Sequence, residues 1–145
     1  MVLPAGIHPA TLAEVETTFA VNQARRSLYG GLVSAAISLH SAGCGLIYLD
    51  GSYVTAKPVP GDYDALWDPA GIKVAKLDPV FLDFSNNRLS QKTKFKGEFF
   101  PANAVNFPSQ PFIEFFQVDR FSGGRKGILS VALSTDPVLT GKVQP

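Results

Sequence analysis

The chain has little of several features that would narrow its cellular setting. Cys44 is its only cysteine, so no disulfide can form within the chain, and a reducing compartment fits. The 13 basic and 12 acidic residues leave a net charge of +1, which gives no general attraction to nucleic acid or to a membrane. No apolar run approaches the roughly 20 residues of a membrane span, and the first 12 residues lack the pattern of a signal peptide. We therefore expect a cytoplasmic protein with no membrane partner, and we do not expect DNA as a partner.

Two helices are predicted in the first part of the chain. Thr11 followed by Glu14 forms a capping-box pattern, which predicts a short helix over residues 12–19. A second helix begins near residue 22 or 24, because apolar residues then recur at helical spacing. The glycine pair Gly30-Gly31 weakens this helix, and such pairs often permit close packing. The apolar face of the second helix consists of Leu28, Leu32, Ala35, Ala36 and Leu39.

Short apolar runs predict the strands of a sheet. The predicted strands cover residues 44–49, 62–67, 98–100 and 127–133. The segment after Asp78 is ambiguous, since Asp78-Pro79 can start a helix while residues 80–84 can also form a strand. The tail from about residue 136 is expected to be irregular. With 145 residues, of which 46% are hydrophobic, we expect a single domain over residues 1–145, of α+β (or α/β) class, with a small mixed sheet flanked by helices.

Two carboxylates stand at alternate positions of the second predicted strand. Asp62 and Asp64 point to the same face of that strand, so both can reach one metal ion. Carboxylate oxygens are the ligands that Mg²⁺ prefers. Gly51-Ser52, at the end of the preceding strand, offers a close backbone approach and hydrogen-bond donors for a phosphate. Together the two halves suit nucleotidyl transfer, which needs divalent metal, a cradle for the triphosphate and positioning. Each half alone is more typical of a glycine turn or a solvated acidic strand.

The order and spacing of these residues also carry a family resemblance. Leu49-Asp50-Gly51-Ser52 followed by Asp62-Tyr63-Asp64 resembles the Gly-Ser…Asp-x-Asp signature of the DNA polymerase β-type nucleotidyltransferase superfamily. The short chain is similar to the minimal nucleotidyltransferases of that superfamily, which often occur in toxin–antitoxin pairs. Further segments are Gly6-Ile7-His8-Pro9-Ala10-Thr11, Lys96-Gly97-Glu98-Phe99-Phe100-Pro101 and Lys126-Gly127-Ile128. With residues 50–64, they resemble a family of small, uncharacterised bacterial and phage proteins placed in the same superfamily.

The resemblance implies a nucleotidyltransferase-like fold, a bound nucleoside triphosphate (NTP), Mg²⁺ or Mn²⁺, and a third carboxylate on a later strand. Glu98, at the start of an apolar strand, is predicted to be this third catalytic and metal-binding acid, and Asp83 is the alternative. Gly51 and Ser52, with Lys57 in the loop between the motif halves and Lys126 after a glycine turn, are predicted to bind the nucleotide. Further basic candidates for a triphosphate or an acidic acceptor are Arg88, Lys92, Lys94 and Lys96, for most of which a solvated face is the more common role.

Two functions compete at this stage. In the first, the protein is an enzyme that moves a nucleotidyl (NMP) group from an NTP to a hydroxyl of a protein or an RNA. Asp62 and Asp64 then bind metal, and the third acid binds metal or deprotonates the acceptor. In the second, the protein has a catalytically degenerate nucleotidyltransferase fold and recognises a partner, such as a cognate toxin or antitoxin, without chemistry. Three carboxylates that converge within metal-bridging distance would favour the enzyme. Two that converge without the third would favour the binding protein.

Overall fold

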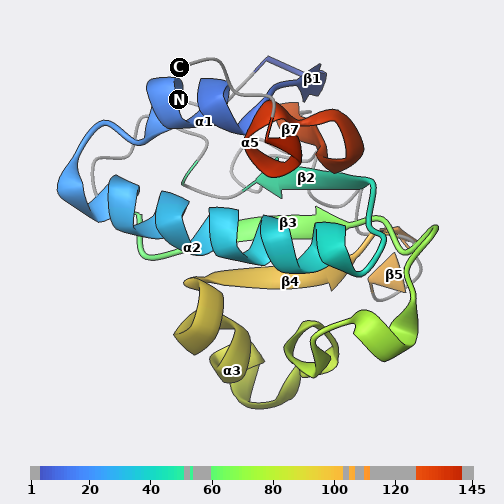
Figure 1. Ribbon diagram of the computed structural model, residues 1–145. Helices are drawn as coiled ribbons and strands as arrows, with labels where there is room; N and C mark the ends of the chain where they lie inside the picture. Colours follow the sequence, from blue (N-terminus) through green and yellow to red (C-terminus); the bar gives the residue numbers. More distant parts are fainter. Residues whose placement is uncertain are drawn as a thin grey trace.

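The computed structural model describes residues 4–50, 53, 60–102, 105–106, 110–111 and 127–141. These residues form an α+β fold with a five-stranded mixed sheet, so the fold class predicted from the sequence is confirmed (Figure 1). The strands of this sheet are β1 (Gly6–Pro9), β2 (Leu46–Asp50), β3 (Tyr63–Trp67), β4 (Gly97–Pro101) and β7 (Gly127–Ala132). A separate pair of two-residue strands comprises β5 (Val105–Asn106) and β6 (Gln110–Pro111).

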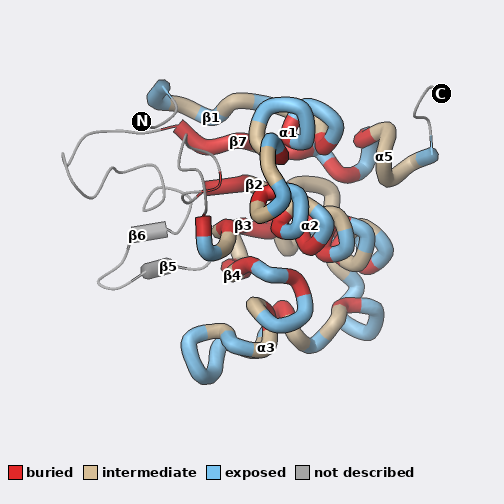
Figure 2. The backbone as a smooth tube through the Cα atoms, turned by 90° about the vertical axis from the view of Figure 1, so that its left-hand side faces the viewer, coloured by how far each residue is buried: buried red, intermediate tan, exposed pale blue. Residues whose placement is uncertain are grey.

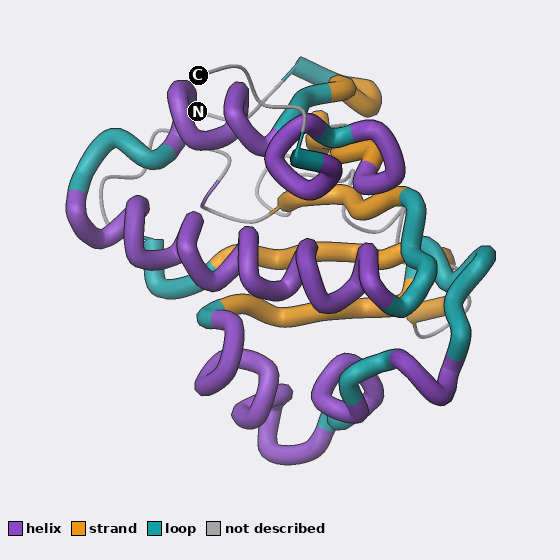
Figure 3. Tube along the Cα trace, in the orientation of Figure 1, coloured by secondary structure: helices purple, strands orange, loops and turns teal. Residues whose placement is uncertain are grey.

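Two helices separate β1 from β2 in the sequence, further helices separate β3 from β4, and others follow β7 (Figure 3). The α-helices are α1 (Leu12–Phe19), α2 (Gln23–Ser41), α3 (Ser85–Phe95) and α5 (Pro137–Thr140). The 3₁₀ helices are η2 (Val74–Lys76), η3 (Pro79–Leu82) and η4 (Leu133–Thr135). Both predicted N-terminal helices are confirmed. The Thr11 hydroxyl accepts a hydrogen bond from Glu14 N at 3.1 Å, and the Glu14 carboxylate accepts one from Thr11 N at 2.9 Å, which completes the capping box.

The sheet runs in the order β1–β7–β2–β3–β4. The β1–β7 and β3–β4 pairs are parallel, while β2 is antiparallel to both of its neighbours. A parallel pair needs a crossover connection. Between β3 and β4 this crossover contains η2, η3 and α3, and it brings α3 against the edge strand β4 (Figure 1). Side chains of α3 therefore lie near the end of the sheet where the predicted acids are found.

Alternation of side chains gives the sheet two faces with different neighbours. One face carries Leu49, Ala65 and Phe99, which belong to the same buried core cluster as Leu32 and Leu39 of α2. Figure 2 shows α1, α2 and α5 gathered on this side of the buried strands. The helical spacing that predicted an apolar face on α2 is therefore confirmed, because all five of the predicted residues are buried.

The opposite face of the sheet is also partly apolar. Leu66 and Ile128 are fully buried there and Phe100 is nearly so, yet none of the three belongs to the cluster beneath α2. The sheet therefore excludes water from both faces along much of its length. Carboxylates that emerge on this second face stand beside apolar neighbours, where electrostatic interactions are stronger than in open solvent.

Some local expectations were ambiguous or wrong. Residues 79–82 form the 3₁₀ helix η3 with Asp78 as N-cap, which resolves the choice between helix and strand. The chain from residue 136 is not irregular throughout, because α5 covers residues 137–140 and Asp136 caps it. The thiol of Cys44 is buried, and burial raises its pKa. No helix within the described ranges is long and apolar enough to cross a membrane.

Candidate functional site

Three carboxylates from neighbouring strands lie side by side on the face of the sheet that α2 does not cover. Asp50, the last residue of β2, pairs with Asp64 of β3, and Asp64 pairs in turn with Glu98 of β4. Paired residues point to the same face, with their Cα atoms about 5 Å apart. Asp50, Asp64 and Glu98 therefore form a row across three strands, which we call the acidic row.

The acids of the row differ in exposure. Asp50 is only 2% exposed, whereas Asp64 is partly exposed. Asp62 lies directly before β3 and is also partly exposed. Sequence reasoning selected Asp62 and Asp64 but not Asp50. The position of Asp50 at the end of an apolar run, directly before Gly51, was the available signal, and only the β2–β3 pairing shows that it faces Asp64.

Glu98 is the predicted third acid that the structure brings to Asp64. Asp83 lies instead at the end of η3, where it accepts hydrogen bonds from the Ser85 hydroxyl at 2.6 Å and the Ser90 hydroxyl at 2.8 Å. These bonds, with a further one from Ser85 N, lower the pKa of Asp83. The local role of Asp83 is thus to bridge η3 and the start of α3 rather than to join the acidic row.

Glu98 has a basic neighbour from α3. Lys92 Nζ lies 3.0 Å from Glu98 Oε1, and both side chains are largely covered, with 34% and 23% of their surfaces exposed. The adjacent residue, Gln91, is fully buried and accepts a hydrogen bond from Phe99 N at 2.8 Å. Because Gln91 precedes Lys92 and Phe99 follows Glu98, this bond fixes the register in which the two charges meet.

Arg88 is a second cation that α3 places on this face. Its guanidinium carbon lies 4.0 Å from the ring centre of Phe100, two residues beyond Glu98 on the same side of β4. The backbone reaches this position through three consecutive residues of positive φ, at 52° for Asn86, 55° for Asn87 and 61° for Arg88. Such a left-handed turn without glycine is costly, so the surrounding contacts must stabilise it. The turn directs a basic side chain toward the strand that carries Glu98.

A buried tyrosine holds the strand between the two predicted aspartates. Tyr63, flanked by Asp62 and Asp64, donates a hydrogen bond from its hydroxyl to Phe95 O at 2.8 Å. Burial raises its pKa well above the ordinary value. The carboxylates beside Tyr63 are therefore carried by a strand that is anchored to the C-terminal end of α3.

The predicted nucleotide-binding residues Gly51, Ser52, Lys57 and Lys126 lie outside the described residues. The residue after Ser52, Tyr53, is described and fully buried. Arg25 Nη1 donates to Tyr53 O at 2.6 Å, and the Tyr53 hydroxyl donates to Arg25 O at 3.2 Å. Burial raises the pKa of Tyr53 to about 12. The buried Arg25, which nothing in the sequence pattern distinguishes from a surface arginine, thus fixes the chain directly after the predicted phosphate-binding pair.

The donor set of the acidic row fits a hard divalent cation, because carboxylate oxygens are the ligands that Mg²⁺ and Mn²⁺ prefer. The backbone register of Asp64 and Glu98 also fits shared ligation. In the part of the chain that the structure describes, no three acidic, histidine or cysteine side chains gather closely enough to hold a metal. Glu98 is turned toward Lys92. Lys92 therefore competes with a metal for the Glu98 carboxylate.

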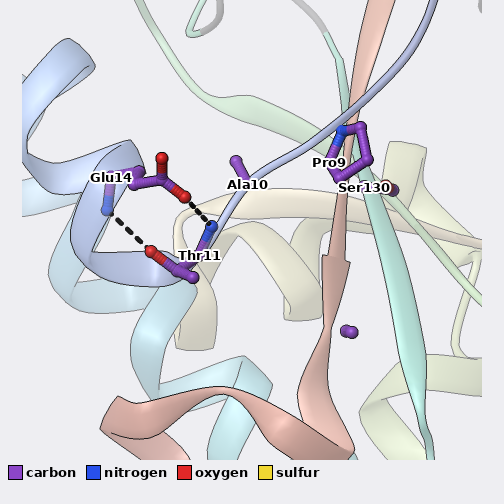
Figure 4. Close-up of a pocket in the computed structure, with 6 residues that line it drawn as sticks. Pro9, Ala10, Thr11, Glu14 and Ser130 are labelled. Atoms are coloured by element: carbon purple, nitrogen blue, oxygen red, sulfur yellow. Dashed lines mark hydrogen bonds between the residues drawn. The ribbon is translucent and has the colours of Figure 1, made fainter.

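A shallow pocket lies elsewhere, where β1 leads into α1 (Figure 4). It is lined by Pro9, Ala10, Thr11, Glu14, Ser130 and Ala132. The polar groups of Thr11 and Glu14 are engaged with each other in the capping box, as the dashed lines in Figure 4 show. This pocket is therefore explained by the start of a helix, and the acidic row is the better candidate for chemistry.

The fold and the site define a class of protein: a small α+β protein whose mixed sheet has helices over one face and a row of carboxylates on the other. The model of a family of unknown function (DUF6932) matches residues 1–132 of the chain. The chain belongs to this family. No curated protein and no solved structure matches it.

Proposed function

We propose that the chain is a metal-dependent nucleotidyltransferase, which moves an NMP group from an NTP to a hydroxyl of a protein or an RNA. The observation that carries this proposal is the pairing of Asp64 with Glu98, which sets an acid of the resembled signature beside the predicted third acid. The single, buried Cys44 thiol suits a cytoplasmic setting for such an enzyme. A cognate toxin or antitoxin is the protein partner that the resemblance favours.

In the proposed reaction, the acceptor oxygen forms a bond to the α-phosphorus while the bond to the β-phosphate oxygen breaks, releasing pyrophosphate. Asp62, Asp64 and Glu98 are the residues that would hold Mg²⁺ or Mn²⁺. When bound, such a cation neutralises charge on the phosphates and on the leaving group. The proton of the acceptor hydroxyl passes to the third acid, Glu98. Gly51 and Ser52, with Lys57 and Lys126, bind the phosphates in this proposal.

The anchoring of the strands supports this assignment. Nucleotidyl transfer depends on positioning more than on covalent help from the protein. Tyr63 ties the strand of Asp62 and Asp64 to α3, and Gln91 ties α3 to the strand of Glu98. The three acids are therefore carried on backbone that buried hydrogen bonds hold in register, as a preorganised site requires.

The test compares the two candidate third acids in one assay. The full chain is incubated with radiolabelled NTPs, Mg²⁺ and a lysate, and labelled protein and RNA are resolved on gels. We expect the wild type to label a product, and Glu98→Gln and Asp64→Asn to lower labelling at least about 100-fold, because each removes a carboxylate that would hold the metal. Asp83→Asn is the matched control and should retain labelling within a few fold. A wild type that labels nothing, or a Glu98→Gln variant as active as the wild type, would contradict the proposal.

A second candidate is a binding protein of the same fold without chemistry. It is favoured by the ion pair of Glu98 with Lys92, which gives the third acid a cation from the chain itself. Exposed apolar side chains on η3 and near α3 add a surface for a partner; they are Leu82, Phe84 and Leu89. Calorimetry separates the two candidates. Nucleotide binding that requires Mg²⁺ supports the enzyme, and its absence supports the binding protein.

A further inference from the structure

The ion pair of Lys92 with Glu98 links a lysine of α3 to the end of the acidic row. Lys92 Nζ and Glu98 Oε1 are 3.0 Å apart. Glu98 lies opposite Asp64, which lies opposite Asp50, so Lys92 stands at the β4 end of a row of acids. A single ammonium there offsets negative charge that neighbouring strands bring together.

The surroundings fix the backbone beside Lys92 and leave its side chain partly exposed. Gln91, the preceding residue, is fully buried and uses both ends of its amide, accepting from Phe99 N at 2.8 Å and donating to Val80 O at 3.1 Å. About a third of the Lys92 side chain remains exposed, at 34%. A lysine head on a flexible stem can therefore change partners without any movement of α3.

We propose that Lys92 is an exchange cation: it occupies Glu98 in the free protein and transfers to the triphosphate of the NTP when Glu98 turns to a divalent metal. This inference rests on the proposed function. No covalent bond forms or breaks in this exchange. One ion pair, ammonium with carboxylate, is replaced by another, ammonium with phosphate.

The exchange is favourable only when metal and nucleotide arrive together. With metal alone, Lys92 leaves its carboxylate and stands near a second cation, with no phosphate to replace Glu98. With metal and triphosphate, the phosphate oxygens give the ammonium a stronger charge-assisted partner. The two ligands should therefore raise each other's affinity, since a coupling between two binding events is reciprocal.

The experiment measures Mn²⁺ binding to the full chain by electron paramagnetic resonance, with and without α,β-methylene-ATP, which resists transfer. The variants are Lys92→Met, which keeps most of the side-chain length but not the charge, and Lys94→Met as control. Lys94 lies two residues away on α3 and pairs with Asp78 rather than with the acidic row. A partly exposed ion pair that competes for Glu98 should weaken Mn²⁺ binding about two- to fivefold.

We expect Lys92→Met to bind Mn²⁺ alone about two- to fivefold more tightly than the wild type. The analogue should strengthen Mn²⁺ binding in the wild type and in Lys94→Met, and do so less in Lys92→Met. In a chain that also carries Glu98→Gln, Lys92→Met should no longer change the affinity for Mn²⁺. The proposal is overturned if Lys92→Met binds Mn²⁺ no more tightly than the wild type, which includes the case where neither binds it.

The outcomes separate this inference from the proposed function. If labelling by the wild type is observed and Lys92→Met binds Mn²⁺ as the wild type does, the enzyme stands and the exchange is wrong. If no labelling is found but Lys92→Met gains Mn²⁺ affinity through Glu98, Lys92 is a counter-ion at a metal site and the transfer reaction is wrong.

Discussion

The ring of Tyr63 covers Gly97 on the neighbouring strand so closely that a Cβ on Gly97 would lie 2.5 Å from two of the ring carbons. The two residues are register partners in the parallel pairing of β3 with β4, directly before the pair of Asp64 and Glu98. The ring needs this space because its hydroxyl reaches Phe95 O at 2.8 Å. A glycine before Glu98 therefore permits the tyrosine that anchors the strand of Asp64.

Substitutions at this pair should lower stability to different extents. Tyr63→Phe leaves the buried Phe95 carbonyl without this donor, and we expect a loss of about 1–2 kcal/mol. Gly97→Ala forces the ring aside, and we expect a loss of about 1–3 kcal/mol from overpacking. Urea unfolding followed by circular dichroism measures both. Gly45→Ala is the control, since nothing lies within 4 Å of its added Cβ, and it should change stability by less than about 1 kcal/mol. A Gly97→Ala variant as stable as Gly45→Ala would contradict the described packing.

The adjacent glycines Gly30 and Gly31 of α2 should respond in opposite directions to alanine. A Cβ on Gly31 would lie 2.1 Å from Phe95 O, so Gly31→Ala must push α2 away from the end of α3. We expect it to cost about 1–3 kcal/mol. A Cβ on Gly30 meets nothing within 4 Å, so Gly30→Ala should gain about 0.5–1 kcal/mol from helix propensity. Thermal unfolding of the two variants tests the pair. Equal shifts in the same direction would show that α2 and α3 do not approach each other here.

Local patterns in the sequence predicted part of this fold, namely the two N-terminal helices and four strands of the sheet. The capping box of Thr11 and Glu14 and the apolar spacing of α2 depend on neighbours within a few residues, and both are confirmed. The strand of Asp62 and Asp64 was expected at residues 62–67 and is observed at residues 63–67. Such features follow from side-chain periodicity and backbone capping, which are local properties.

Features that depend on contacts between distant parts of the chain could not be predicted from local sequence patterns. The sequence favours Glu98 over Asp83 as the third acid, but the position of Glu98 opposite Asp64 follows from strand pairing, which a single sequence does not display. The turn at Asn86 to Arg88 has positive φ angles although it contains no glycine, the residue type that most often indicates them. The left-handed residue that ends α3 is Lys96, with φ of 65°, although its neighbour Gly97 would adopt this conformation at lower cost. At this turn and at Lys96, tertiary contacts override local preference.

The end of the chain shows how a local signal can be overlooked. Asp78-Pro79-Val80 indicates a possible helix start in the sequence. Asp136-Pro137-Val138 has the same three residue types, but it falls in the tail that was expected to be irregular. Both aspartates accept a hydrogen bond from the valine N–H at 3.0 Å. The motif itself therefore predicted α5, since aspartate is a favoured N-cap and proline fits the first helical position.

Asp136 differs from Asp78 in a contact that spans the chain, and this difference predicts its greater importance. Its other oxygen accepts a hydrogen bond from Leu12 N at 2.8 Å, and the residue is only 2% exposed. One carboxylate thus joins the first turn of α1 to the first turn of α5. Asp136→Ala leaves two backbone donors without this acceptor, and we expect a loss of roughly 2–4 kcal/mol.

Asp78→Ala is the matched control for Asp136→Ala, because it removes the same cap from the same tripeptide. It also breaks the pair with Lys94, and such partly exposed ion pairs contribute little. We expect Asp78→Ala to cost about 1 kcal/mol. Asp136→Asn, which retains one acceptor oxygen, should fall between the two alanine variants. Urea unfolding midpoints of the three variants measure the contribution of the contact with Leu12. If Asp136→Ala and Asp78→Ala lose equal stability, this contact contributes nothing, and Asp136 caps α5 without tying it to α1.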